Sequence, residues 1–117
     1  MAEDKLIDLS KDFAVDIINI CKEIRENRKE QVLVNQLLRS GTSIGANIHE
    51  GNYASSRADF VNKLQIALKE CFETEYWLEL FQKTGYLTLT EYRNLYNSCS
   101  KIRTKLSASI TTAKKRL

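Results

Sequence analysis

Two carboxylates at helical spacing, Glu70 and Glu73, are the residues of this sequence best placed for acid–base chemistry. On a helix they share a face with Trp77, and two carboxylates on one face can divide the roles of general acid and general base. Such residues more often pair with a cation or an amide across a helix contact, because an unpaired buried charge is costly. We therefore expect a structural pair with Arg39 or Asn47 as its partner.

The only histidine, His49, has no partner at metal-ligand spacing. The di-metal site of helical bundles needs Glu-x-x-His on two helices, but Ala46 stands where the glutamate would be. The zinc motif H-E-x-x-H fails as well, because its last position is Tyr53. No lysine follows the glycines at the spacing of a phosphate-binding loop. No Ser or Cys has a plausible general base beside it, so a nucleophilic site is not supported either. We expect no metal, no cofactor and no enzymatic activity.

Positive charge is concentrated in the last quarter of the chain. Residues 91–117 hold seven basic residues and one acidic residue, although the net charge of the chain is only +3. Such a run is usually a solvated helix face, and basic side chains near a helix end also complement its dipole. It could also contact phosphates, although no RRM, KH or helix-turn-helix signature accompanies it. The candidate nucleic-acid-binding residues are Lys101, Arg103, Lys105, Lys114, Lys115 and Arg116.

An acidic ridge near the start of the chain suggests a different use for these cations. Asp4, Asp8, Asp12 and Asp16 recur at strict four-residue spacing and share one side of a helix. The ridge of one subunit could meet the basic face of another. The protein would then be an assembly scaffold without nucleic-acid binding, and its basic side chains would be used in assembly.

The elements that must position these residues are helices. The chain of 117 residues has no proline and only four glycines, which argues against a sheet protein with frequent turns. Apolar residues recur at spacings of three and four in four stretches. We expect one domain, residues 1–117, folded as an all-α, antiparallel up-and-down four-helix bundle.

Local signals mark where the helices begin and end. The first helix should end around residues 26–29, and residues 50–55 should form the loop that ends the second helix. Ser56 has the spacing of a capping box with Asp59, and Gly85 is suited to follow the third helix. Thr90 can cap the fourth helix, whose apolar stripe runs to Leu117.

Two helices carry unusual faces. Gly41 and Gly45 lie inside the second helix, where each costs about 1 kcal/mol relative to alanine. Close packing against another helix would offset that cost, and we expect the partner to be the third helix. The third helix is apolar on two sides, one widened by Phe72 and the other holding Ile66 and Trp77. A second apolar side indicates a central helix or an oligomer contact.

The sequence predicts a cytoplasmic protein. No stretch has the roughly 18 uninterrupted apolar residues of a membrane-spanning helix, and the acidic start does not resemble a secretory signal. Cys21, Cys71 and Cys99 are odd in number and fall in apolar stripes. They are expected to be buried thiols in a reducing compartment.

Two segments resemble the signature of a known family. Residues 39–51 read R-S-G-T-S-I-G-A-N-I-H-E-G, and residues 60–78 read F-V-N-K-L-Q-I-A-L-K-E-C-F-E-T-E-Y-W-L. Both are similar to motifs of the bacterial 23S rRNA intervening-sequence protein family, also called the four helix bundle protein family. Gly41 departs slightly, since Ser or Ala is more usual there. The motif residues assigned to helix contact are Arg39, Ser43, Gly45, Asn47, Glu50, Gly51, Glu70, Glu73 and Trp77.

The resemblance implies a cytoplasmic bundle that assembles into a ring-like homopentamer. It also implies a relation to accessory proteins of diversity-generating retroelements, which bind nucleic acid and a reverse transcriptase through a basic surface. No catalytic residues come with it. We therefore expect a non-enzymatic, oligomeric helical protein that binds RNA or DNA through pooled basic faces, with a protein partner possible.

Overall fold

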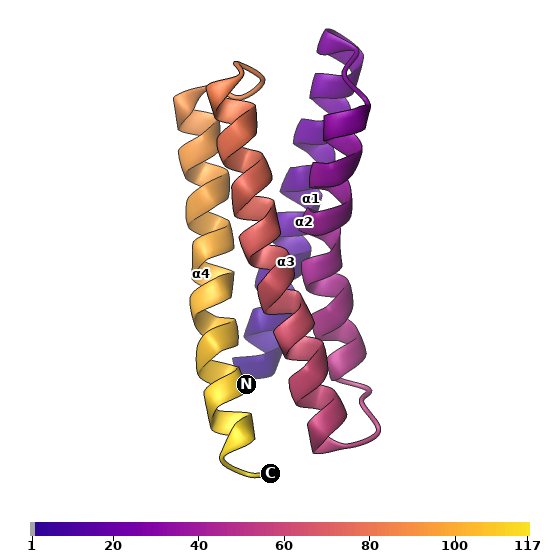
Figure 1. Cartoon of the computed structure of the whole chain (residues 1–117), viewed down its shortest axis with the longest axis vertical. Helices are drawn as coiled ribbons and strands as arrows, with labels where there is room; N and C mark the ends of the chain where they lie inside the picture. Colours follow the sequence, from indigo (N-terminus) through magenta and orange to yellow (C-terminus); the bar gives the residue numbers. More distant parts are fainter. Residues whose placement is uncertain (1) are drawn as a thin grey trace.

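The computed structural model describes residues 2–117, with side chains from residue 5 onward, and every regular element in that range is a helix. The helices are α1 (Ala2–Arg28), α2 (Val32–Gly51), α3 (Arg57–Lys83) and α4 (Leu89–Lys114). They run alternately up and down in a bundle of 47 × 22 × 20 Å (Figure 1). The predicted antiparallel up-and-down four-helix bundle is confirmed.

Each helix packs against two neighbours. α2 lies between α1 and α3, and α4 lies between α3 and α1, so α1 and α3 are diagonally opposite. The contact between α1 and α4 is the least extensive of the four. Both chain ends and the connection from α2 to α3 lie at one end of the bundle, the lower end in Figure 1. We call this end, made by residues 52–56 and the last turn of α4, the terminal end.

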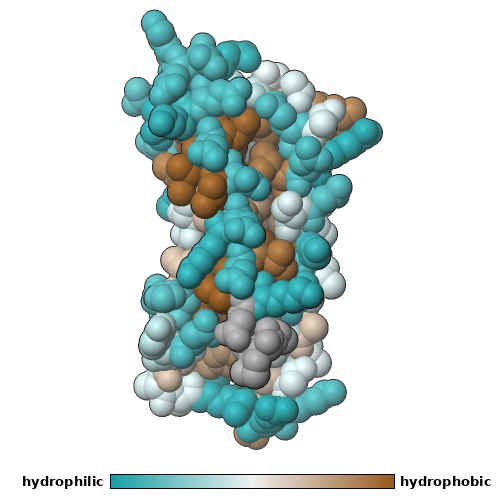
Figure 2. Space-filling model, turned by 180° about the vertical axis from the view of Figure 1, so that it is seen from behind, coloured by the Kyte–Doolittle hydropathy of each residue, from teal (hydrophilic) through white to brown (hydrophobic). Residues whose placement is uncertain are grey.

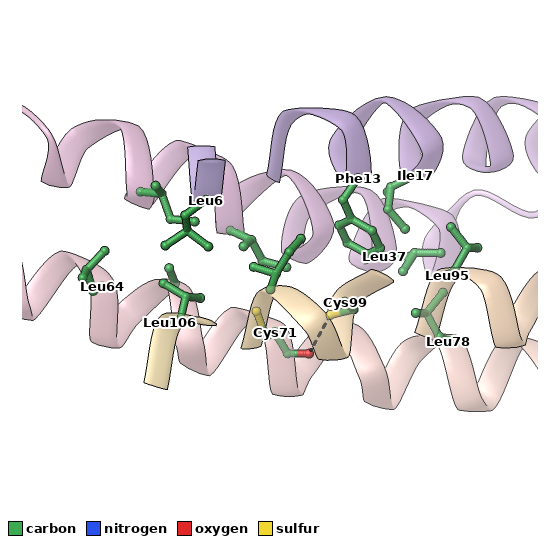
Figure 3. Packing of buried hydrophobic residues seen from close by; sticks show 14 of the residues in the cluster. Leu6, Phe13, Ile17, Leu37, Leu64, Cys71, Leu78, Leu95, Cys99 and Leu106 are labelled. Atoms are coloured by element: carbon green, nitrogen blue, oxygen red, sulfur yellow. Dashed lines mark hydrogen bonds between the residues drawn. The ribbon is translucent and has the colours of Figure 1, made fainter. Parts of the chain in front are cut away.

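One apolar stripe from each helix forms the core. Phe13 and Ile17 of α1, Leu37 of α2, Leu78 of α3 and Leu106 of α4 are almost completely buried (Figure 3). Burial of each such side chain stabilises the fold by about 1.5 to 3 kcal/mol. The stripes predicted from three- and four-residue spacing are thus present. None of the helices in residues 2–117 is apolar over a stretch long enough to cross a membrane.

Side-chain caps begin α3 and α4. Oγ of Ser56 accepts a hydrogen bond from the N–H of Asp59 at 3.1 Å, as expected. The cap of α4 is Thr88, so the prediction of Thr90 was wrong. Thr88 Oγ1 accepts from the N–H of Glu91 at 3.1 Å, and the Glu91 carboxylate accepts from the N–H of Thr88 at 2.8 Å. Only a residue three positions before the glutamate can form this reciprocal pair.

The ends of α1 and α3 agree with the sequence, and those of α2 and α4 differ from it. α1 ends at Arg28, and α3 is followed by Gly85 in the left-handed region, at φ 83°. α2 continues to Gly51, slightly further than expected. α4 ends at Lys114, so Leu117 lies beyond the helix and is exposed rather than part of the apolar stripe.

Gly41 and Gly45 of α2 do make a close helix contact, but with α1 and not with α3. A Cβ at Gly41 would lie 2.9 Å from Cγ2 of Ile17, and a Cβ at Gly45 would lie 3.1 Å from Oγ of Ser10. Both neighbours belong to α1, so the expectation of α3 was wrong. Because the two glycines are four residues apart, they share one side of α2, and the side that faces α3 is offset from it.

Candidate functional site

The carboxylate pair is held by an arginine. The guanidinium of Arg39 on α2 donates to Glu70 at 3.4 Å and also to Glu73, both on α3. The indole N–H of Trp77 donates to the same Glu73 carboxylate at 3.3 Å. Arg39 is therefore the cationic partner expected from the sequence. Asn47 is not a partner, because its amide donates to the carbonyl oxygen of Ser43 at 2.8 Å.

The remaining motif residues also make contacts within the fold. Ser43 donates through its hydroxyl to the carbonyl oxygen of Arg39 at 2.6 Å. Glu50 at the end of α2 pairs with Lys63 of α3 at 3.1 Å. A Cβ at Gly51 would lie 3.4 Å from Cβ of Lys63 and 3.6 Å from the Phe60 ring, so α2 and α3 approach closely there. The motif therefore describes how α2 sits between its two neighbours.

A buried hydroxyl pair at the same contact was not predicted. The hydroxyl oxygens of Ser40 and Thr74 lie 3.0 Å apart, and both side chains are fully buried. The Thr74 hydroxyl is also 2.8 Å from the carbonyl oxygen of Glu70. The sequence offered one signal for this pair, since polar Thr74 lies in line with the apolar positions Ala67, Cys71 and Leu78.

The candidate cations of α4 divide into three settings. Arg103 lies at the contact with α3, where its Nε–H donates to Glu75 at 2.8 Å and Nη2 donates to Ser100 at 3.0 Å. Its guanidinium also lies over the Phe72 ring, 5.3 Å from the centroid. The hydrogen bond to Glu75 raises the pKa of Arg103 above its ordinary value. Arg103 is thus committed to the α3–α4 contact and is removed from the nucleic-acid-binding set.

Lys101 and Lys105 lie on the flank of α4. Lys101 shares a hollow between α1 and α4 with Asp12 and Asp16. These two members of the acidic ridge reduce the positive potential around Lys101 from within the same chain. Lys105 is half-buried. The side chain of Asp4, the first member of the ridge, lies outside the described residues.

Lys114, Lys115 and Arg116 lie at the terminal end and are exposed. Arg116 lines two adjoining hollows together with Arg57 and Phe60 from the first turn of α3. One hollow, of about 250 Å³, is completed by small residues of α4. The other, of about 380 Å³, is completed by the α2–α3 connection. We call the two together the end cleft. No pattern in the sequence pointed to Arg57, because only the fold brings it beside Arg116.

The three cysteines are buried and free. Burial raises the pKa of Cys21 to about 11. A hydrogen bond with Cys71 and then burial raise the pKa of Cys99 well above its ordinary range. The thiol of Cys99 also lies 3.6 Å from the backbone carbonyl oxygen of Cys71 (Figure 3). The thiols of Cys21 and Cys99 are therefore protonated at neutral pH. All three cysteines lie in the core, as predicted.

Two exposed apolar patches lie on diagonally opposite helices. On α3, Phe72 and Tyr76 are 54% and 56% exposed, so Phe72 does not widen the buried face as expected. On α1, Val15 and Ile18 are 54% and 46% exposed. Figure 2 shows apolar patches between hydrophilic side chains on the face seen from behind. The second apolar side predicted for α3, which holds Ile66 and Trp77, is half-buried, and Trp77 packs against the core.

Fold and contacts together define a four-helix-bundle protein whose α2–α3 contact carries a recognisable motif. The chain belongs to the 23S rRNA-intervening sequence protein family, whose family model matches residues 3–108. It is also similar to a crystal structure from Bacteroides thetaiotaomicron VPI-5482, a protein of unknown function from the S23 ribosomal protein family. The two chains are 50% identical with a TM-score of 0.93, over 95% of this chain and 99% of that one. No curated protein matches the chain.

Proposed function

We propose that this protein is a non-enzymatic, oligomeric helical-bundle protein that binds nucleic acid, RNA or DNA, through its basic surface. The observation that carries the proposal is the charge of residues 91–117, seven basic residues against one acidic residue, in a chain of net charge +3. The ion pairs between described side chains use Arg39, Lys63 and Arg103, and none uses the cations of residues 114–116. Those cations can therefore contact phosphates without giving up a carboxylate partner from residues 5–117.

Ring assembly would multiply this charge. The apolar patches of α1 and α3 lie on opposite sides of the bundle, so one subunit can bind the next through two different surfaces. Such a head-to-tail contact closes into a ring when the rotation between subunits allows it. In a homopentamer, five copies of the basic surface would act together and raise the local potential. Membership of a family described by 23S rRNA intervening sequences agrees with a role near RNA.

Salt-dependent binding tests the nucleic-acid part of the proposal. We expect the protein to bind structured RNA or DNA at low salt, with an affinity that falls as salt rises because counterions are released. Substituting Lys101, Lys105, Lys115 and Arg116 by alanine should weaken binding. If the protein shows no affinity at low salt, or if these substitutions do not change its affinity, nucleic-acid binding through this surface is rejected. The alternative that remains is an assembly scaffold.

The mass in solution tests assembly. We expect five times the 13.5 kDa of one chain by size-exclusion chromatography with light scattering. Tyr76→Asp should dissociate the ring by placing a charge on the α3 patch, whereas Thr104→Asp, at an exposed position of α4, should leave it intact. Charge reversal at Asp8 and Asp12 addresses the scaffold alternative, in which the acidic ridge holds the oligomer together. If the charge reversal dissociates the oligomer and Tyr76→Asp does not, the result would favour assembly through the acidic ridge.

A further inference from the structure

The end cleft combines three features of a site for single-stranded nucleic acid. Two arginines, Arg57 and Arg116, come from different parts of the chain and line both hollows. The half-buried ring of Phe60 lines the same two hollows. No carboxylate lines either hollow among the described residues. A cationic groove with an aromatic surface is the arrangement that binds single strands, where phosphates contact the cations and a base stacks on the ring.

Local contacts hold the cleft in shape. The first intrahelical hydrogen bond of α3 runs from the N–H of Phe60 to the carbonyl oxygen of Ser56 at 3.0 Å, so Arg57 and Phe60 both sit on the first turn. Gly51 lies behind the ring, since a Cβ there would be 3.6 Å from Cδ1 of Phe60. The ring is therefore supported by α2 and open toward the cleft.

Nearby carboxylates are already occupied. Asp59 accepts a hydrogen bond from the N–H of Ser55 at 3.3 Å, and Glu50 pairs with Lys63. The beginning of α3 adds the positive end of a helix dipole, which favours an anion. The end of α4 carries the opposite dipole, but the basic residues 114–116 more than offset it.

The setting of this cleft differs from that of the flank of α4. On the flank, Lys101 is next to Asp12 and Asp16, and Arg103 is bonded to Glu75. In the end cleft, neither arginine side chain forms an ion pair with another described residue. Among the side chains that the structure describes, a phosphate at the end cleft would therefore not compete with an ion-paired carboxylate.

We infer that the end cleft binds single-stranded nucleic acid, with Arg57 and Arg116 contacting phosphates and Phe60 stacking against a base. This inference rests on the proposed function and narrows it, because it moves the contact from the flank of α4 to the terminal end. The hollows of about 250 and 380 Å³ have room for an unstacked base and its phosphate. The bases of a duplex are paired and stacked on one another, so they are not free to stack on the Phe60 ring.

Fluorescence anisotropy with labelled oligothymidylate and oligouridylate tests the assignment. We expect the double variant Arg57→Ala/Arg116→Ala to lose about tenfold or more in affinity at low salt, and the salt slope should fall by about 0.7 for each phosphate that is no longer neutralised. The matched control Lys101→Ala/Lys105→Ala removes the same charge from the flank and should change affinity much less. Arg93→Ala, an exposed arginine at the other end of α4, should bind as the unaltered protein does.

The stacking step has its own variants. Phe60→Leu keeps an apolar side chain but removes the ring, and we expect a loss of about fivefold or more for single strands. Phe60→Tyr should restore binding, and thermal unfolding of each variant checks that the bundle is intact. A duplex of the same sequence should bind more weakly and be insensitive to Phe60→Leu.

The outcomes separate this inference from the function on which it rests. If the unaltered protein binds no nucleic acid at low salt, the proposed function fails and the cleft assignment fails with it. If it binds, but affinity is lost on substitution of Lys101 and Lys105 rather than of Arg57 and Arg116, the proposed function stands and the cleft assignment is overturned. Equal binding of single strands and duplex would overturn the single-strand specificity.

Discussion

Two arginine–glutamate clusters join α3 to its neighbours, and they differ in their access to water. At the α2–α3 contact, the Arg39 side chain is 51% exposed, and its partners Glu70 and Glu73 are 15% and 36% exposed. At the α3–α4 contact, Arg103 bonds to Glu75, whose side chain is only 10% exposed. Water screens the first cluster and offers its charges an alternative partner, whereas the second carboxylate has little else to bond. The same pair of residue types should therefore contribute differently to stability.

Removing the cation that pairs with buried Glu75 should have the largest effect. Arg103→Ala leaves the Glu75 carboxylate buried without its cation, and we expect a loss of about 2 to 3 kcal/mol in the free energy of unfolding. Urea denaturation followed by circular dichroism measures it. Arg103→Lys keeps the charge but loses the planar guanidinium donors. Its stability should lie between that of the unaltered protein and that of Arg103→Ala. A loss no greater than that of Arg39→Ala would contradict the comparison.

Alanine at the glycines extends the comparison to the contact between α1 and α2. Gly41→Ala places a Cβ 2.9 Å from Ile17, so overpacking should exceed the helix propensity gained and leave a net loss of about 1 kcal/mol. Gly51→Ala meets its neighbours at 3.4 Å or more and should stabilise by about 0.5 kcal/mol. Thermal melts of the two variants should move in opposite directions. A rise of both melting temperatures would show that the α1–α2 contact adjusts easily, and a fall of both would show that the α2–α3 contact at Gly51 has no room for a Cβ.

The start of α4 provides a smaller test near the α3–α4 contact. Thr88→Ala removes the capping hydroxyl and should cost about 1 kcal/mol, by loss of the bond to the N–H of Glu91. Thr90→Ala alters a helical residue with no capping role and is the matched control. Denaturant midpoints of the two variants measure the difference. The reverse order of stability would place the cap at Thr90 after all.

The exposed cluster should respond least. Arg39→Ala should cost about 0.5 kcal/mol, because the pair is half in water and its attraction is screened. The loss should shrink further in high salt, which denaturation at two salt concentrations measures. A loss above that of Thr88→Ala, or one unchanged by salt, would mean that Arg39 does more than bridge two partly exposed carboxylates.

Much of the fold was predictable because it depends on local periodicity. Apolar residues at three- and four-residue spacing place Phe13, Leu37, Leu78 and Leu106 on their inner faces whatever the neighbours are. The cap of α4 was also within reach of the sequence, since Thr88 and Glu91 have the capping-box spacing. The direction of the glycine contact was not, because the spacing of Gly41 and Gly45 shows that they share a side but not which helix that side meets.

The candidate site shows the same division. The sequence located an excess of cations in residues 91–117 and a carboxylate pair that needed a cation. It could not separate Arg103, bonded to Glu75, from Arg116, which meets Arg57 across the end cleft. Arg57 and Arg116 are 59 positions apart in the chain, and no local pattern relates them.

By itself, the sequence determined four helices, their inner faces, the family motif and the sign of the charge near the chain end. Each of these follows from residue types within a few turns of helix. The tertiary structure alone decided which helix the glycines face, which cations are bonded to carboxylates, and which two arginines share a cleft. These depend on the order and rotation of helices around the bundle, which distant residues set by packing together.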